Sequence, residues 1–170
     1  MRTAQIRRRF AAGTRNPTAL AFHPQTGDLY ALVQERDGLG DLVPSDYLIR
    51  VQEGGFYGWP YAYIGKHPQP GFANRAPDKV QATITPDLLF EAHSSVLDLV
   101  FYEGNQFPPE YKGHAFVALK GSWNRIEPTA IRSCACHSRT ADLKASMRIL
   151  PLDSGYPASD AQKYGGVLPP

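Results

Sequence analysis

The amino-acid sequence predicts an all-β fold built from short strands. Runs rich in β-branched and aromatic residues recur along the chain and are separated by turn residues. Gly and Pro number 15 each among the 170 residues, which exceeds their usual combined share of roughly 12%. No stretch before residue 125 sustains a helical stripe over three turns. Together these observations favour strands joined by many tight turns.

The clearest local structure is a hairpin near the N-terminus. Strand-like runs at 19–22 and 28–33 flank the segment 23–27, which reads His-Pro-Gln-Thr-Gly. Proline presets one turn dihedral and glycine supplies a positive φ, so this segment predicts a β-turn between two strands. Further apolar runs predict strands at 47–51, 87–90, 96–102 and 114–119. A turn is expected at 107–111 and a surface excursion at 65–79.

The strand sets recur at a regular spacing. They begin near residues 18, 47 and 87, which is consistent with four-stranded blades of about 40 to 45 residues. The repeat is structural, because the sets share no convincing sequence similarity. After Arg125 this rhythm ends, so residues 126–170 are predicted to form an irregular tail.

Charge and hydropathy exclude several classes of partner. A net charge of +2 is too small to attract nucleic acid or a membrane surface by bulk electrostatics. No run of roughly 18 apolar residues is present to span a membrane. Residues 1–9 are rich in arginine but have no apolar stretch behind them, so no signal peptide is expected and the chain as written is cytoplasmic. Cys134 and Cys136 are too close for an ordinary framework disulfide.

Five sequence blocks, in matching order and spacing, resemble the glucose/sorbosone dehydrogenase family. The blocks are Arg15–Tyr30, Glu35–Asp41, Gly54–Pro60, His93–Ser95 and Gly121–Arg125. The match is best to the L-sorbosone dehydrogenase-like branch and covers roughly residues 10–125. The resemblance implies a soluble or periplasmic quinoprotein that uses pyrroloquinoline quinone (PQQ) and calcium, on a six-bladed β-propeller, to oxidise a sugar or aldehyde substrate.

The resemblance also implies a domain plan. Residues 13–125 form a partial propeller of roughly two to three blades, residues 1–12 are an N-terminal extension, and residues 126–170 are a frameshifted or irregular tail. Back-translation of residues 130–141 with permitted codons, read from the third base, gives an alternating strand followed by a turn. This motivates the frameshift hypothesis, which resequencing of the encoding DNA tests directly. An intact frame, with no family-like strand in another frame, contradicts it.

In the family, residues matching Arg15 and Asn16 reach the quinone end of PQQ. A guanidinium there stabilises negative charge as the quinone accepts a hydride. Lys120 follows a predicted strand and matches a position where a lysine contacts the cofactor, as a point charge for a PQQ carboxylate. The alternatives are a solvated turn at Arg15 and Asn16, and an exposed strand-end cation at Lys120. Trp59 and Trp123 are expected in the buried aromatic core.

The segment 35–41 matches the family's calcium loop. Calcium prefers carboxylate and carbonyl oxygens, and Glu35, Asp37 and Asp41 supply the carboxylates. The related branch commonly has two adjacent acids where this chain has Asp41 and Leu42, so we expect weakened metal binding. The alternative is a solvated acidic turn.

No catalytic residue is assigned. The family's histidine base lies upstream of the matched blocks, and none of His23, His67, His93 and His114 matches it. The chain is therefore expected to be a fragment that is inactive alone, with a possible partner chain carrying the missing blades. The alternative function is a non-enzymatic β-propeller segment for binding or assembly, with the aromatic residues of 56–63 exposed for recognition.

Overall fold

The computed structural model describes residues 8–129, 131–136 and 147–150. Within these residues, ten strands and three short helices follow one another: β1 Asn16–Phe22, β2 Leu29–Gln34, β3 Ser45–Arg50, β4 Ala62–Tyr63, β5 His67–Pro68, η1 Ala73–Arg75, α1 Pro77–Gln81, β6 Leu88–Ala92, β7 Val96–Phe101, η2 Pro109–Tyr111, β8 Ala115–Leu119, β9 Arg132–Cys136 and β10 Met147–Leu150. The all-β class is confirmed. Among the described residues, no helix is long or apolar enough to cross a membrane.

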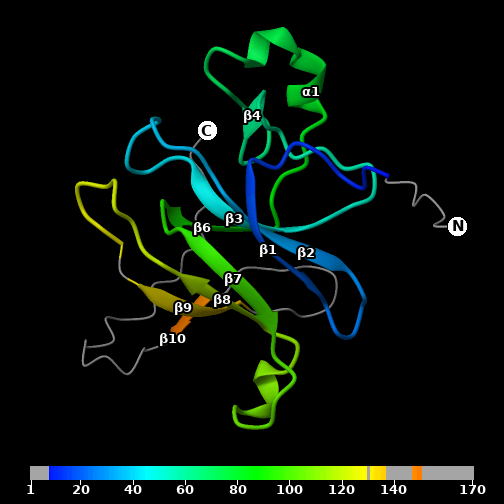
Figure 1. Ribbon diagram of the computed structural model, residues 1–170, viewed down its shortest axis with the longest axis vertical. Coiled ribbons are helices and arrows are strands. Elements are labelled where there is room, and N and C mark those ends of the chain that lie inside the picture. The colour runs from blue at the N-terminus through cyan, green and yellow to red at the C-terminus, as the bar shows by residue number, and fades with distance from the viewer. Residues whose placement is uncertain (1–7, 130, 137–146, 151–170) are drawn as a thin grey trace, which may run out of the picture.

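The strands form two four-stranded antiparallel sheets. The first has the order β1-β2-β3-β6 and the second the order β7-β8-β9-β10, and both are visible in Figure 1. Each sheet is a meander in which consecutive strands of the sheet are neighbours, which is the topology of a propeller blade. The predicted hairpin is present, with Phe22 opposite Leu29 and Ala21 opposite Tyr30. The structure therefore contains two blades of a partial propeller.

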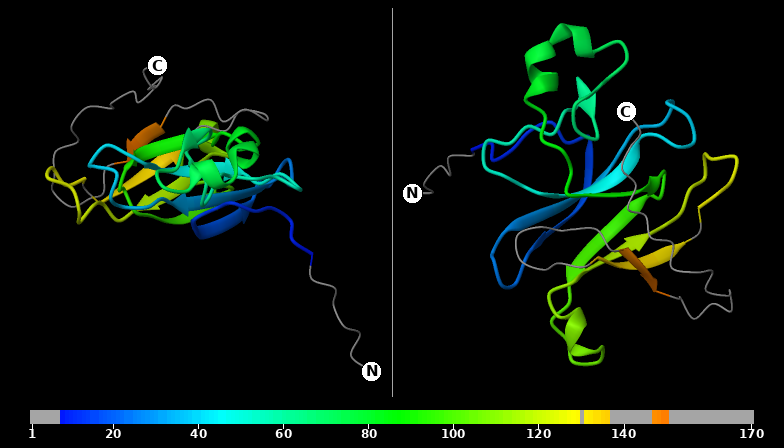
Figure 2. Two further views of the ribbon diagram at one scale, coloured as in Figure 1. Left: turned by 90° about the horizontal axis from the view of Figure 1, so that it is seen from above. Right: turned by 180° about the vertical axis from the view of Figure 1, so that it is seen from behind.

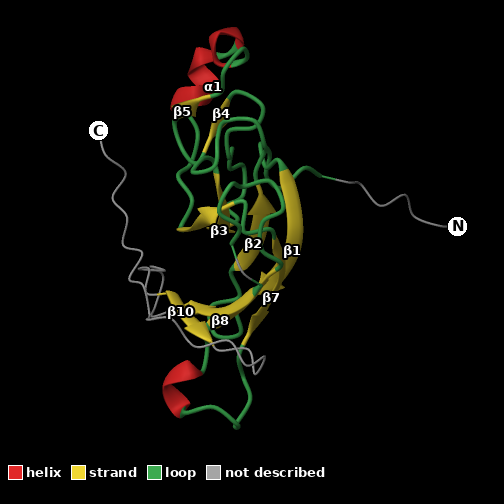
Figure 3. Ribbon diagram, turned by 90° about the vertical axis from the view of Figure 1, so that its left-hand side faces the viewer, coloured by secondary structure: helices red, strands yellow, loops and turns green. Residues whose placement is uncertain are grey.

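A shared apolar core joins the two blades. Tyr30, Leu32 and Phe90 of the first sheet belong to one cluster of buried residues with Val117 and Cys134 of the second. Figure 3 shows the second sheet following the first along the long axis of the molecule. Each fully buried aliphatic or aromatic side chain contributes about 1.5–3 kcal/mol relative to exposure. The core of the contact between the blades is therefore hydrophobic.

The outer face of the first sheet is covered by the connection that follows β3. Val33, Tyr47 and Ile49 pack there against Tyr57 and Ile64. Tyr57 is 3% exposed, and its hydroxyl donates to the Arg50 carbonyl oxygen at 2.8 Å. The expectation that the aromatic residues of 56–63 are exposed for recognition is therefore wrong, since Tyr57 is buried and the other four are partly buried. Tyr57 is buried because its ring packs against Val33, Tyr47 and Ile49 on this face of the sheet.

The segment from β4 to α1 is an excursion from the first sheet. It holds the short β4–β5 pair, the η1 turn and the five-residue helix α1. Figures 1 and 2 show it at the opposite end of the molecule from η2. This matches the predicted surface excursion at 65–79.

The segment after Arg125 differs from the sequence expectation in two places, because residues 147–150 form β10 and residues 132–136 form β9. Residues 132–136 pair with β8 so that Cys134 lies opposite Val117 and Cys136 opposite Ala115. Their composition is poor in strand formers, but the edge of β8 pairs with them and burial of both cysteine side chains completes the core. Residue 130 and residues 137–146 and 151–170 of the expected tail lie outside the described residues, and the frameshift hypothesis stays a prediction.

Candidate functional site

Three loops meet at one end of the two sheets, and we call them the loop group. The first, 35–43, joins β2 to β3; the second, the turn 93–95, joins β6 to β7; the third, 120–126, follows β8. In Figure 1 the first and third are the long loops on the left of the molecule. The loop group contains or adjoins every residue that the sequence assigned to cofactor or metal.

Side chains join the first and third loops directly. The Asn124 amide nitrogen donates to Asp37 Oδ1 at 2.5 Å, and the Ile126 backbone N–H donates to Asp41 Oδ2 at 2.8 Å. These contacts join residues more than 80 positions apart in the sequence, and they connect the first blade to the second. Two of the predicted metal ligands therefore act as acceptors between loops.

His93 lies between these two loops. Its side chain is 6% exposed, and its Nε2 lies 2.9 Å from the Gly40 carbonyl oxygen. Its Nδ1 lies 3.3 Å from the Asn124 amide nitrogen and 3.4 Å from Asp37 Oδ1. The sequence placed His93 in a family block but gave it no role, because its neighbours come from distant loops.

Asp46 connects the first loop to the turn between the blades. Its Oδ1 accepts the Glu35 backbone N–H at 2.8 Å, and its Oδ2 accepts the Ser95 backbone N–H at 2.7 Å. Burial raises the pKa of the Asp46 carboxyl, and these backbone hydrogen bonds oppose that rise. Sequence reasoning missed this residue because an acid at the start of a strand has no distinctive pattern.

Arg15 and Asn16 lie beside the start of the first loop. Arg15 Nη1 donates to the Glu35 carbonyl oxygen at 2.7 Å, and its guanidinium carbon lies 5.8 Å from the centroid of the Trp59 ring. The Asn16 amide donates to Gln34 Oε1 at 3.1 Å. Both residues remain exposed, so their polar groups are accessible to a ligand.

Lys120 lies at the same end of the blades. Its backbone N–H donates to the Ser95 carbonyl oxygen at 3.0 Å. Gln34 Nε2 donates to Ser95 Oγ at 3.0 Å, so a chain of hydrogen bonds runs from Asn16 through Gln34 and Ser95 to Lys120. The Lys120 side chain is exposed. Two cations and a side-chain amide are donors that suit a polycarboxylate such as PQQ.

Glu35 is a buried acid within this group. It is 7% exposed, and its Oε2 accepts the Arg36 backbone N–H at 3.2 Å. Burial raises the pKa of the Glu35 carboxyl to about 7, and the Arg36 N–H and the Arg15 charge oppose the rise. Burial, followed by the Glu35 charge, also raises the pKa of Tyr47.

The described side chains do not fit a calcium ion. Within the described residues, no three His, Cys, Asp or Glu side chains form a group that could hold a metal. Glu35, Asp37 and Asp41 each accept a hydrogen bond from a different protein donor, which engages one oxygen of each carboxylate. The Gly40 carbonyl oxygen already accepts from His93.

The two tryptophans differ in exposure. Trp59 is partly buried beneath the Arg15 guanidinium, whereas Trp123 is 79% exposed. The expectation that Trp123 belongs to the aromatic core is therefore wrong. Trp123 lies in the loop after β8, where the sheet does not cover its indole ring. Ile126 in the same loop is 90% exposed.

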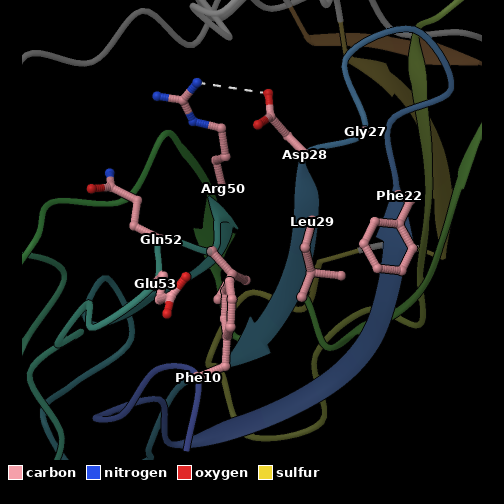
Figure 4. Close-up of a pocket in the computed structure, with 9 residues that line it drawn as sticks. Phe10, Phe22, Gly27, Asp28, Leu29, Arg50, Gln52 and Glu53 are labelled. Carbon is pink, nitrogen blue, oxygen red and sulfur yellow. Dashed lines mark ion pairs between the residues drawn. The ribbon is translucent and has the colours of Figure 1, made fainter.

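A separate cavity of about 560 Å³ lies at the other end of the first sheet. Figure 4 shows Phe10, Phe22 and Leu29 among its lining residues, with Arg50 and Asp28 forming an ion pair at 3.7 Å. Because β2 runs from Leu29 to Gln34, the cavity and the loop group lie at opposite ends of this strand. Residues from this cavity therefore serve as controls for the loop group.

The family model described as Glucose / Sorbosone dehydrogenase matches residues 2–133. The chain belongs to the glucose/sorbosone dehydrogenase family. This confirms the resemblance that the five sequence blocks carried, and the match extends beyond them to the start of β9. A relative in this comparison is an uncharacterized protein of Borreliella burgdorferi, 36% identical over 124 residues, which covers 72% of this chain and 32% of the relative.

Solved structures show the same fold. A glucose dehydrogenase aligns with a TM-score of 0.61 and 21% identity over 84% of this chain and 36% of that protein. The PQQ-bound form of an aldose sugar dehydrogenase from Streptomyces coelicolor aligns with a TM-score of 0.53 and 18% identity, covering 83% of this chain and 32% of that protein. The present chain spans about a third of the length of these relatives.

Proposed function

We propose that these two blades bind PQQ through the loop group, as part of a PQQ-dependent dehydrogenase of sugars or related aldehydes. The observation that carries the proposal is the placement of Arg15, Asn16 and Lys120 at one end of two adjoining blades, with Trp59 beside Arg15. Membership of the family and the PQQ-bound structure of a protein with the same fold support this choice of ligand.

Each residue has a distinct task in this proposal. PQQ, when bound, supplies a quinone that accepts a hydride from the substrate. The Arg15 guanidinium and the Asn16 amide would hold the quinone end of the cofactor by hydrogen bonds and would favour negative charge there. Lys120 pairs with a carboxylate as a point charge. Trp59 holds the Arg15 side chain by a cation–π contact.

The chain by itself is proposed not to turn over substrate. A dehydrogenase of this kind needs a base for the substrate hydroxyl proton. His93 is buried and directs Nε2 at the Gly40 carbonyl oxygen, so it does not serve as that base. The whole protein that contains such blades is proposed to act in the periplasm.

Two measurements on the full chain test this function. Fluorescence titration with PQQ should show saturable binding. An excess of another tricarboxylate of similar shape should compete with PQQ. Dye reduction with glucose or sorbosone, in the presence of PQQ and calcium, should remain at background. Absence of saturable PQQ binding contradicts the proposed site, and dye reduction that depends on PQQ contradicts inactivity.

A second candidate function is a non-enzymatic assembly module. It is favoured by exposed apolar residues on β1 and β7, two strands that contact each other. Leu20, Phe22, Leu97 and Val100 are 63%, 70%, 47% and 60% exposed. Apolar strand faces of this kind mark contact surfaces, and further blades are the proposed partner. Sedimentation of the full chain as a monomer in a mixture with a chain that carries further blades would contradict this candidate.

A further inference from the structure

The turn that joins the two blades places a histidine where both long loops can reach it. His93 has φ +62°, a left-handed conformation that most side chains avoid and that His, Asn and Asp adopt more readily. Its side chain is 6% exposed. The neighbouring Ser95 also has a positive φ, of +55°, and its backbone N–H is fixed by Asp46. The turn therefore holds the imidazole in one place.

The two ring nitrogens of His93 contact different loops. Nε2 must carry a proton, because its partner at 2.9 Å is the Gly40 carbonyl oxygen, which only accepts. In the neutral ring Nδ1 then accepts, and the Asn124 amide nitrogen lies 3.3 Å away as the donor. The same amide donates to Asp37 Oδ1. One side chain thus links Gly40 of the first loop to Asn124 of the third.

We propose that His93 is a positioning residue that holds loop 35–43 of the first blade against loop 120–126 of the second. The inference rests on the proposed function in one respect. It assumes that PQQ needs the spacing between Arg15 and Lys120 that this contact maintains. Arg15 is fixed to the first loop at the Glu35 carbonyl oxygen, and Lys120 opens the third loop. The hydrogen bonds Asn124–Asp37 and Ile126–Asp41 also join these loops, so loss of the His93 link loosens the spacing of the two cations and does not abolish it.

Hydrogen–deuterium exchange of the full chain without PQQ tests the positioning role. His93→Asn keeps a residue that tolerates the left-handed backbone, but its shorter side chain does not span from Asn124 to Gly40. Exchange at the Ile126 amide, which donates to Asp41 across the loops, and in peptides of loop 35–43 should accelerate about two- to tenfold, the effect of losing one hydrogen bond. His93→Gln places an amide nitrogen near the position of Nε2 and should restore part of the protection.

His67→Asn is the matched control, because His67 is an exposed histidine of β5 outside the loop group. It should leave the Ile126 amide and loop 35–43 unchanged. Unchanged loop exchange in His93→Asn, or an equal acceleration in β2 and β3, overturns the positioning role, since the second result reports general destabilisation.

PQQ titration of the same variants separates this inference from the proposed function. His93→Asn should weaken PQQ binding by about the factor seen in loop exchange, and His93→Gln by less. PQQ affinity that is unchanged in His93→Asn overturns the link between the loop spacing and the site. A wild-type chain that binds no PQQ, with loop exchange still accelerated in His93→Asn, refutes the proposed function but supports the positioning role.

Discussion

Replacing Glu35 by glutamine should change how the stability of the chain depends on pH. Burial raises the pKa of Glu35 from its ordinary value of 4.5 to about 7. The folded chain therefore keeps a proton on Glu35 over a pH range in which the unfolded chain has lost it. Stability from this group is fully present below pH 4.5 and is lost as the pH rises toward 7.

The size of the effect follows from the two pKa values. The full difference corresponds to about 3.4 kcal/mol at about 1.36 kcal/mol per pKa unit, of which about 2.5 kcal/mol is lost between pH 5 and pH 8. Glu35→Gln removes this titration. The amide oxygen of the glutamine side chain can still accept the Arg36 N–H, so the fold should persist.

Urea unfolding at pH 5 and pH 8, followed by tryptophan fluorescence in the presence of EDTA, measures the difference. The wild-type chain should lose about 2.5 kcal/mol more unfolding free energy than Glu35→Gln over this range. Asp46 is common to both chains, so its titration cancels apart from its electrostatic coupling to Glu35. Parallel pH profiles for the two chains would refute the reasoning.

The other predictions concern the connections around the site and the core. Asp46→Asn should cost about 1–3 kcal/mol in urea unfolding, because one backbone N–H loses its acceptor; an unchanged midpoint would contradict the Asp46 bridge. Burial raises the pKa of Cys134 to about 11 and that of Cys136 further, so both thiols should react slowly with Ellman's reagent at pH 8 and rapidly in urea; fast native reaction would show that β9 is open. Phe90→Ala should cost about 3–5 kcal/mol, since Phe90 is 2% exposed in the core between the blades; a cost below about 1 kcal/mol would contradict that packing.

Local chemistry explains the part of the fold that the sequence predicted. The β1–β2 hairpin depends on neighbouring residues, with a proline and a glycine in the segment 23–27 between two apolar runs. Membership of the family rests on ordered blocks of residues, and the family match confirms it. Positions such as Trp123 could not be predicted in the same way. Its exposure depends on whether a distant element covers the loop, and none of the described residues does so fully.

The connections of the candidate site depend on contacts between residues far apart in the chain. His93 meets Gly40, and Asn124 meets Asp37, across 53 and 87 sequence positions. No periodicity or turn pattern reports such pairs. The strand β9 was missed for a related reason, because Arg132–Cys136 is a weak strand former that pairs with the edge of β8.

The most direct test of the account is a PQQ titration of the wild-type chain and two charge variants. Arg15→Met and Lys120→Met should each weaken PQQ binding about ten- to a hundredfold, because each removes a charge-assisted contact worth about 1.5–3 kcal/mol. Arg50→Met, which removes a cation of the cavity at the other end of the first sheet, should bind PQQ like the wild type. Equal affinities for all four chains, or no saturable PQQ binding to the wild type, would contradict the claim that the loop group is a PQQ site.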